Sequence, residues 1–275
     1  MKKPVLYEPG KPINRFQMLG NILRRHLSEV MLVSLYCFLF SLPLLGWVIF
    51  SINVDFLRQD NAYAILIVDG VGALLLGVLG LSFAGGMLFF KKLIFGEGAS
   101  LKEDFAHGIR RNGGLFFLIF LVVGALYLLL HLGLGITAGM EIDGAWKSVL
   151  AGVEYAVFFL LCFVHLFMLS EATMFEGGYF SLLVSSFRLC FASLLKGLPI
   201  YLMVMLPLLL FEFLPFPYFN LAGVLVGAFF HFGFSLACLT LFCNHVYDRS
   251  VFKTQYPELY RKGLAKEVGE GENSL

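Results

Sequence analysis

Six nearly uninterrupted apolar runs, each of about twenty residues, constrain this chain more than any other feature. At about 1.5 Å of rise per residue, each run can cross about 30 Å of hydrocarbon as an α-helix. Strands of a membrane β-barrel would instead alternate polar and apolar residues, and these runs do not. The runs cover residues 30–50, 70–90, 115–134, 149–169, 195–211 and 221–242.

The composition agrees with a lipid environment. The chain is 59% hydrophobic and 14% charged, whereas soluble domains carry about 25% charged residues. In lipid, backbone groups must be satisfied within the protein, which favours helices. The sequence therefore predicts an all-α integral membrane protein with six transmembrane helices. Its membrane domain would cover residues 1–243, and a cytoplasmic tail, disordered toward its end, would cover 244–275.

The charges predict the orientation of these helices. All but two of the 20 Lys and Arg residues fall on one side of the six-span topology, and the exceptions are Arg58 and Lys147. By the positive-inside rule, both termini are expected in the cytoplasm. The basic inner face suits anionic inner-leaflet lipids of the bilayer, and no pattern indicates nucleic acid. The interfacial basic residues on this face include Arg24, Arg25, Lys91, Lys92, Arg110 and Arg111.

Short amphipathic segments precede three of the spans. Residues 13–27 and 100–111 each carry an apolar stripe beside basic residues, and residues 180–191 show a weaker version. We expect each to be an interfacial helix on the cytoplasmic side. Ser100 and Glu103 have the spacing of a capping box at the start of the second segment. The order of surface helix, outward span and returning span indicates a possible threefold repeat. The alternative is that any basic inner loop beside a span has this appearance.

Ionisable groups at membrane depth are candidate functional residues, because burying charge in lipid is costly. The candidate intramembrane polar site comprises His231, His165 and Glu154, and the outer acidic groups include Asp69 and Glu212. Such groups can build a proton relay, a polar pocket or an acidic outer vestibule. The alternatives are a histidine that hydrogen-bonds a neighbouring helix and an acid that extends to water.

Other motifs give no catalytic chemistry. The five cysteines lie in or beside apolar runs without metal-ligand spacing, as expected of small buried hydrophobic residues. The glycines of the second run are expected to allow close helix packing. There is no nucleophile-elbow, zinc-protease or phosphate-loop motif. No enzyme activity, metal or cofactor is expected.

Four stretches of the sequence carry a resemblance to a known family: NRFQMLGNIL, SLPLLG, FFKKLIFGEGASLKEDFAHGIRRN and HVYDRSVFKTQYPELYRKGL. Together they resemble the bacterial YesL-like family of membrane proteins, from about Arg15 to Gly263. That family has no assigned activity. Its members are commonly encoded beside sugar-uptake systems and glycan-degrading enzymes. The resemblance implies a multi-pass protein of the bacterial cytoplasmic membrane with a role connected with carbohydrate uptake, and it implies no site residues.

Two functions remain open. The first is an accessory or scaffold protein associated with a sugar transport system, or with copies of itself through glycine-rich helix faces. The second is a secondary transporter or channel for a small polar solute, which would use the intramembrane histidines and glutamate.

Overall fold

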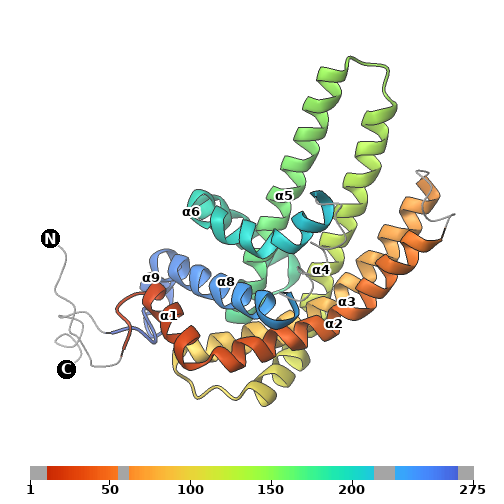
Figure 1. The fold of residues 1–275 in the computed structure, drawn as a ribbon. Helices are drawn as coiled ribbons and strands as arrows, with labels where there is room; N and C mark the ends of the chain where they lie inside the picture. Colours follow the sequence, from red (N-terminus) through yellow and green to blue (C-terminus); the bar gives the residue numbers. More distant parts are fainter. Residues whose placement is uncertain (1–10, 55–61, 214–226, 266–275) are drawn as a thin grey trace. The chain divides into compact units, whose positions relative to one another are not determined.

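The structure, a computed structural model, describes residues 11–54, 62–213 and 227–265, with the backbone alone over 205–213. Every regular element in these ranges is a helix (Figure 1). The elements are α1 (Arg15–Arg25), α2 (Leu27–Asn53), α3 (Ala62–Phe95), α4 (Leu101–Gly139), α5 (Gly144–Met174), α6 (Tyr179–Phe213), η2 (Gly227–His231), α8 (Phe232–Tyr247), η3 (Asp248–Phe252) and α9 (Lys253–Gln255).

Six helical stretches in the described residues are long and apolar enough to cross a membrane. This confirms the all-helical class and the presence of six helices able to span a membrane in the described part of the chain. The fifth stretch begins earlier than predicted, because the apolar residues after Tyr179 are already helical. The six stretches are Leu27–Asn53, Ala62–Phe95, Leu101–Gly139, Gly144–Met174, Tyr179–Val204 and Ala228–Gln255.

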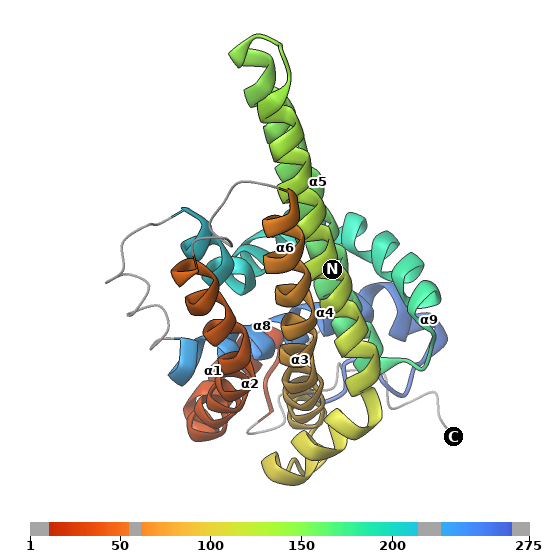
Figure 2. The ribbon, with the colours of Figure 1, turned by 90° about the vertical axis from the view of Figure 1, so that its right-hand side faces the viewer.

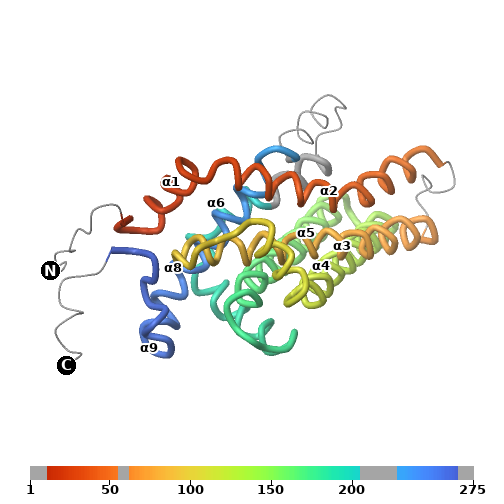
Figure 3. Tube along the Cα trace, turned by 90° about the horizontal axis from the view of Figure 1, so that it is seen from below, coloured from red at the N-terminus to blue at the C-terminus, as the bar shows by residue number. Residues whose placement is uncertain are grey.

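The segments predicted as surface helices differ in structure. Helix α1 is separate, and it ends at His26 before the chain continues into α2 (Figure 3). Residues 101–111 are instead the first turns of α4, and 180–191 lie within α6. Figure 2 shows that α4 changes direction after these first turns. Adjacent glycines at Gly113 and Gly114 explain such a bend, because they weaken helical rigidity.

Side-chain caps begin two of these helices. At α1, the Asn14 side chain accepts from the Gln17 N–H, while Gln17 Oε1 accepts from the Ile13 N–H at 2.9 Å. At α4, the Ser100 N–H donates to Asp104 Oδ2 at 2.8 Å. The acid that reaches back at α4 is therefore Asp104 and not the predicted Glu103. Both acids lie in the first turn, and sequence spacing alone does not separate them.

The helices contribute to two compact units. Unit 1 comprises Met1–Leu35, Gly86–Asp104 and Ser193–Leu275, and unit 2 comprises Tyr36–Gly85 and Phe105–Ala192. Within unit 2, α4 and α5 form an antiparallel hairpin (Figure 1), and α3 lies beside α4 (Figure 2). Within unit 1, α1 packs on α8.

Glycines bring helices close together in both units. In α3, a Cβ added at Gly77, Gly80, Gly85 or Gly86 would lie within 2.9 Å of a neighbouring atom, which confirms close packing at these positions. Gly70 and Gly72 have open space instead. In the sixth stretch, the closest approach is at Gly233, where a Cβ would lie 2.1 Å from the Val30 carbonyl oxygen.

Candidate polar site and its surroundings

Asp69 and His131 form a hydrogen bond between α3 and α4 in unit 2. Asp69 Oδ2 lies 2.8 Å from His131 Nδ1, and the Asp69 side chain is only 9% exposed. The centroid of the Tyr127 ring lies 4.2 Å from the centroid of the His131 ring. Asp69 therefore has a partner on the next helix. The side chain of Glu212, the other predicted outer acid, lies outside the described residues.

Glu154 in α5 faces α4. Its Oε1 accepts a hydrogen bond from Thr137 Oγ1 at 2.8 Å. Its Oε2 is buried and has no hydrogen-bond partner in the described part of the chain. Gly133 leaves room for this carboxyl group, since a Cβ there would lie 3.4 Å from it. Glu154 is thus a half-buried side chain with one carboxyl oxygen hydrogen-bonded to Thr137 and the other buried without a partner in the described residues.

His165 in α5 uses both ring nitrogens. Nδ1 lies 2.7 Å from the Leu161 carbonyl oxygen, and Nε2 lies 2.8 Å from the Tyr179 hydroxyl. A carbonyl oxygen only accepts, so Nδ1 carries the proton and, in the neutral ring, Nε2 accepts from Tyr179. The ring is therefore fully hydrogen-bonded within unit 2.

His231 belongs to unit 1, at the end of η2. Its Nε2 lies 3.3 Å from Ser235 Oγ, one helical turn ahead. The ring also hydrogen-bonds the backbone of Val204 in α6. A packing role requires contacts of this kind. One is made to a hydroxyl one turn ahead, and the other to the backbone of a neighbouring helix. Of the three candidates, Glu154 and His165 lie in unit 2, and each candidate has partners within its own unit.

Most of the predicted interfacial basic residues are accessible. Arg24 and Arg25 on α1 and Arg110 and Arg111 on α4 are exposed. Arg111 pairs with Glu176 at 3.2 Å. Lys91 and Lys92, near the end of α3, are half-buried.

Lys92 also has a structural role that sequence reasoning missed. Its ammonium group pairs with Asp104, the same carboxylate that accepts the Ser100 N–H. Asp104 is 96% shielded from solvent, with a relative exposure of 4%. One carboxylate therefore joins the end of α3 to the start of α4 within unit 1.

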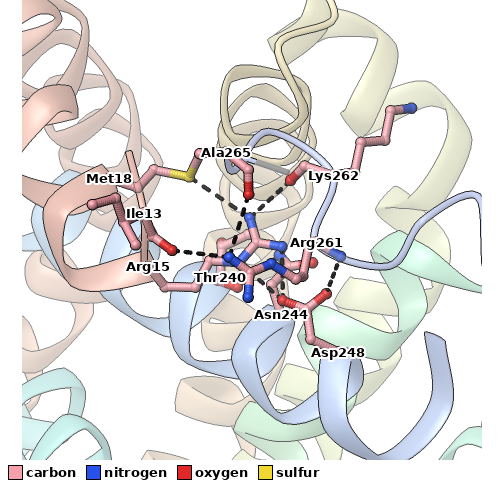
Figure 4. Close-up of polar contacts among 9 residues, drawn as sticks. All are labelled: Ile13, Arg15, Met18, Thr240, Asn244, Asp248, Arg261, Lys262 and Ala265. Atoms are coloured by element: carbon pink, nitrogen blue, oxygen red, sulfur yellow. Dashed lines mark hydrogen bonds and ion pairs between the residues drawn. The ribbon is translucent and has the colours of Figure 1, made fainter. Parts of the chain in front are cut away.

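A buried ion pair between the two ends of the chain was also missed (Figure 4). Arg15 Nη2 lies 2.9 Å from Asp248 Oδ2, with side-chain exposures of 6% and 9%. Arg15 Nε donates to the same oxygen at 3.2 Å. Burial lowers the pKa of the Arg15 guanidinium, and Asp248 raises it in part compensation. The helical pattern of residues 13–27 puts Arg15 among the polar positions, yet it is buried, while Phe16 is 83% exposed.

The C-terminal segment closes around this pair. Arg15 Nη1 donates to the Lys262 carbonyl at 3.0 Å, and the Arg261 N–H donates to Asp248 Oδ1 at 2.9 Å. The Ala265 N–H donates to the Pro12 carbonyl at 3.0 Å. We call Arg15, Asp248, Arg261, Lys262 and Ala265 the terminal clasp. No local pattern in the sequence pairs these residues, because Arg15 and Asp248 lie 233 residues apart.

Glu171 is a second buried acid that sequence reasoning missed. It lies in α5 with 1% exposure, and its two oxygens accept from Ser185 Oγ at 2.8 Å and Ser186 Oγ at 2.6 Å, both in α6. The carboxylate is therefore satisfied by the next helix. The serines in an otherwise apolar stretch were the available signal.

No protein-family model, curated protein or solved structure matches the chain. The interpretation of these groups therefore depends on their geometry. Most membrane-depth polar side chains described above are hydrogen-bonded to an adjacent helix, and Glu154 keeps one oxygen without a partner.

Proposed function

We propose that this chain is an accessory or scaffold protein of a bacterial cytoplasmic membrane, associated with carbohydrate uptake. The observation that carries the proposal is the hydrogen bonding of His165, whose two ring nitrogens are both engaged by immediate neighbours. A proton relay needs a ring that can exchange protons with a pathway. A ring held in this way stabilises helix packing instead. The resemblance to YesL-like proteins supplies the connection with sugar uptake.

The proposed topology has both termini in the cytoplasm. The distribution of Lys and Arg supports it, and so does the exposure of Arg24, Arg25, Arg110 and Arg111. In this orientation α1 and the first turns of α4 lie on the inner leaflet, beside anionic lipids. A threefold repeat of surface segment and hairpin would start at α1, at the beginning of α4 and at the beginning of α6.

Self-association is proposed through the outer part of α3. Gly70 and Gly72 have nothing within 4 Å of an added Cβ. They lie two residues apart, on nearly opposite sides of the helix, and a small residue on either side allows a second helix to approach closely. A partner helix, from a sugar transporter or from a second copy, can dock there.

The second candidate function is a transporter or channel for a small polar solute. The buried Oε2 of Glu154 favours this function, because it is a hydrogen-bond acceptor with no donor in the described residues. A cation or a hydroxyl-bearing solute could supply that donor.

A flux assay separates the two functions. The purified chain is reconstituted in liposomes, alongside Glu154→Gln, and uptake of labelled sugars and of protons is measured. An accessory protein gives no flux above empty liposomes, while its deletion reduces sugar uptake in cells. Flux through the purified chain that Glu154→Gln abolishes would replace the accessory proposal with the transporter.

Topology is tested separately with reporter fusions. Fusions after Lys92 and after Leu275 are expected to report as cytoplasmic, and one near Asp143 as external. An external C-terminus would overturn the proposed orientation without bearing on sugar uptake.

A further inference from the structure

Unit 1 contains a pocket of about 390 Å³ between α1, the end of α3 and the C-terminal segment. This volume falls in the range of ordinary small-ligand sites, about 300–1,000 Å³. All of its lining residues belong to unit 1: Lys11, Pro12, Met18, Asn21, Ile22, Arg25, His26, Leu93, Ile94, Phe95, Gly96 and Gly263.

The lining divides into an apolar part and a basic part. Met18, Ile22, Ile94 and Phe95 supply buried apolar side chains. Lys11, Asn21, Arg25 and His26 supply polar groups, and no carboxylate is among the described lining residues. Arg25 is exposed and makes no ion pair within the described part of the chain. The pocket therefore offers positive charge next to apolar surface.

Nearby acids are already engaged. Glu29 lies 3.4 Å from His26 Nδ1. Glu97 pairs with Lys262, whose ammonium group also lies 5.1 Å from the centre of the Phe95 ring. Neither carboxylate neutralises Arg25 in these contacts, so the positive charge of that side chain is available to a ligand.

The walls of the pocket are fixed in place. Gly96 has a φ of +68° and ends α3, with its N–H donating to the Leu93 carbonyl and the Glu97 N–H donating to the Lys92 carbonyl. Gly263 has a φ of +84°, and a Cβ there would lie 2.0 Å from the Ile94 carbonyl oxygen. The terminal clasp holds this segment against α1. A preformed pocket binds its ligand with less ordering cost.

We propose that this pocket binds the phosphate diester headgroup of an anionic membrane phospholipid. Arg25 binds the phosphate, while the apolar side chains contact the glycerol and the first part of the acyl chains. The pocket lies where the apolar stretch Leu27–Asn53 begins and the apolar stretch Ala62–Phe95 ends, which is the level of the lipid headgroups. A free inorganic phosphate would leave the apolar side chains without a partner. The inference rests on the proposed membrane placement, and not on the role in sugar uptake.

The test compares two neighbouring arginines in the full-length protein. Arg25→Gln removes the charge that lines the pocket, and Arg24→Gln removes an exposed charge on α1 that does not line it. Thermal unfolding in neutral detergent is followed as phosphatidylglycerol or inorganic phosphate is added. We expect phosphatidylglycerol, and not phosphate, to stabilise the wild type and Arg24→Gln. Arg25→Gln should need about fivefold more lipid, corresponding to about 1 kcal/mol for one base near an anionic lipid.

Three results would overturn the proposal. If Arg24→Gln and Arg25→Gln weakened the stabilisation by phosphatidylglycerol equally, the lipid would be binding to diffuse surface charge. If inorganic phosphate stabilised the wild type as much as the lipid does, the pocket would be a site for free anions. A wild type that phosphatidylglycerol does not stabilise would mean no lipid site. Native mass spectrometry of lipid retained after purification supplies the second readout. The uptake assay and the reporter fusions judge the proposed function independently of these results.

Discussion

In unit 1 a buried ion pair joins segments from opposite ends of the chain, whereas in unit 2 the close contacts described above join consecutive helices. Arg15 and Asp248 are 233 residues apart. In unit 2, α3 meets α4 at Gly80 and Gly108, and α5 meets α6 at Glu171. Unit 1 therefore depends on a buried ion pair between α1 and η3, and unit 2 on close backbone packing and short hydrogen bonds between neighbouring helices. The two units should respond differently to single substitutions.

The largest effect is expected from breaking the ion pair of unit 1. Asp248→Ala leaves Arg15 buried without its carboxylate, and loss of one partner of a buried pair costs about 3–5 kcal/mol. The free energy of unfolding is measured by denaturant titration of the full-length protein. Lys262→Gln is the control, because its pair with Glu97 is about one-third exposed, and exposed pairs contribute about 0–1 kcal/mol. Equal losses of unfolding free energy in Asp248→Ala and Lys262→Gln would show that the buried ion pair stabilises the protein no more than a surface pair does.

A smaller loss is expected from filling the contact between α3 and α4 in unit 2. At Gly108 an added Cβ would lie 2.5 Å from the Ala84 carbonyl oxygen and 2.8 Å from Gly85 Cα, so the backbone must move. Overpacking of this kind costs about 1–3 kcal/mol. Gly114→Ala in the same helix is the control, because nothing lies within 4 Å of its Cβ. A Gly108→Ala variant as stable as Gly114→Ala would contradict close packing here.

Some features of both units could be predicted from the sequence alone. The apolar runs predicted six long helices because length and hydropathy are local properties. The glycines in the second run predicted close packing at six positions, and four of them show it. The partner of Glu154, Thr137, could not be predicted, because rotation of α4 about its axis is not encoded in a run of apolar residues.

The terminal clasp could not be predicted from the sequence for a different reason. The helical pattern of residues 13–27 groups Arg15 with the polar positions, and only the distant Asp248 makes its burial possible. Residues 261–265 of the predicted tail hydrogen-bond α1 and the residues just before it, and the boundary at residue 243 stays a prediction. The predicted disorder toward the end of the tail falls on residues outside those described.

The smallest effect is expected at His231, where packing and function make opposite predictions. Glutamine keeps a donor and an acceptor near Ser235 and Val204. Hydrogen bonds between membrane helices average only about 0.6 kcal/mol in double-mutant cycles, so His231→Gln should lower the free energy of unfolding by no more than about that amount. Ser235→Ala removes the same contact from its other side, and the double variant should be less than additive if the two groups interact. A stable His231→Gln variant that nevertheless abolished solute flux in liposomes would assign His231 to a pathway, and would place the functional chemistry in unit 1.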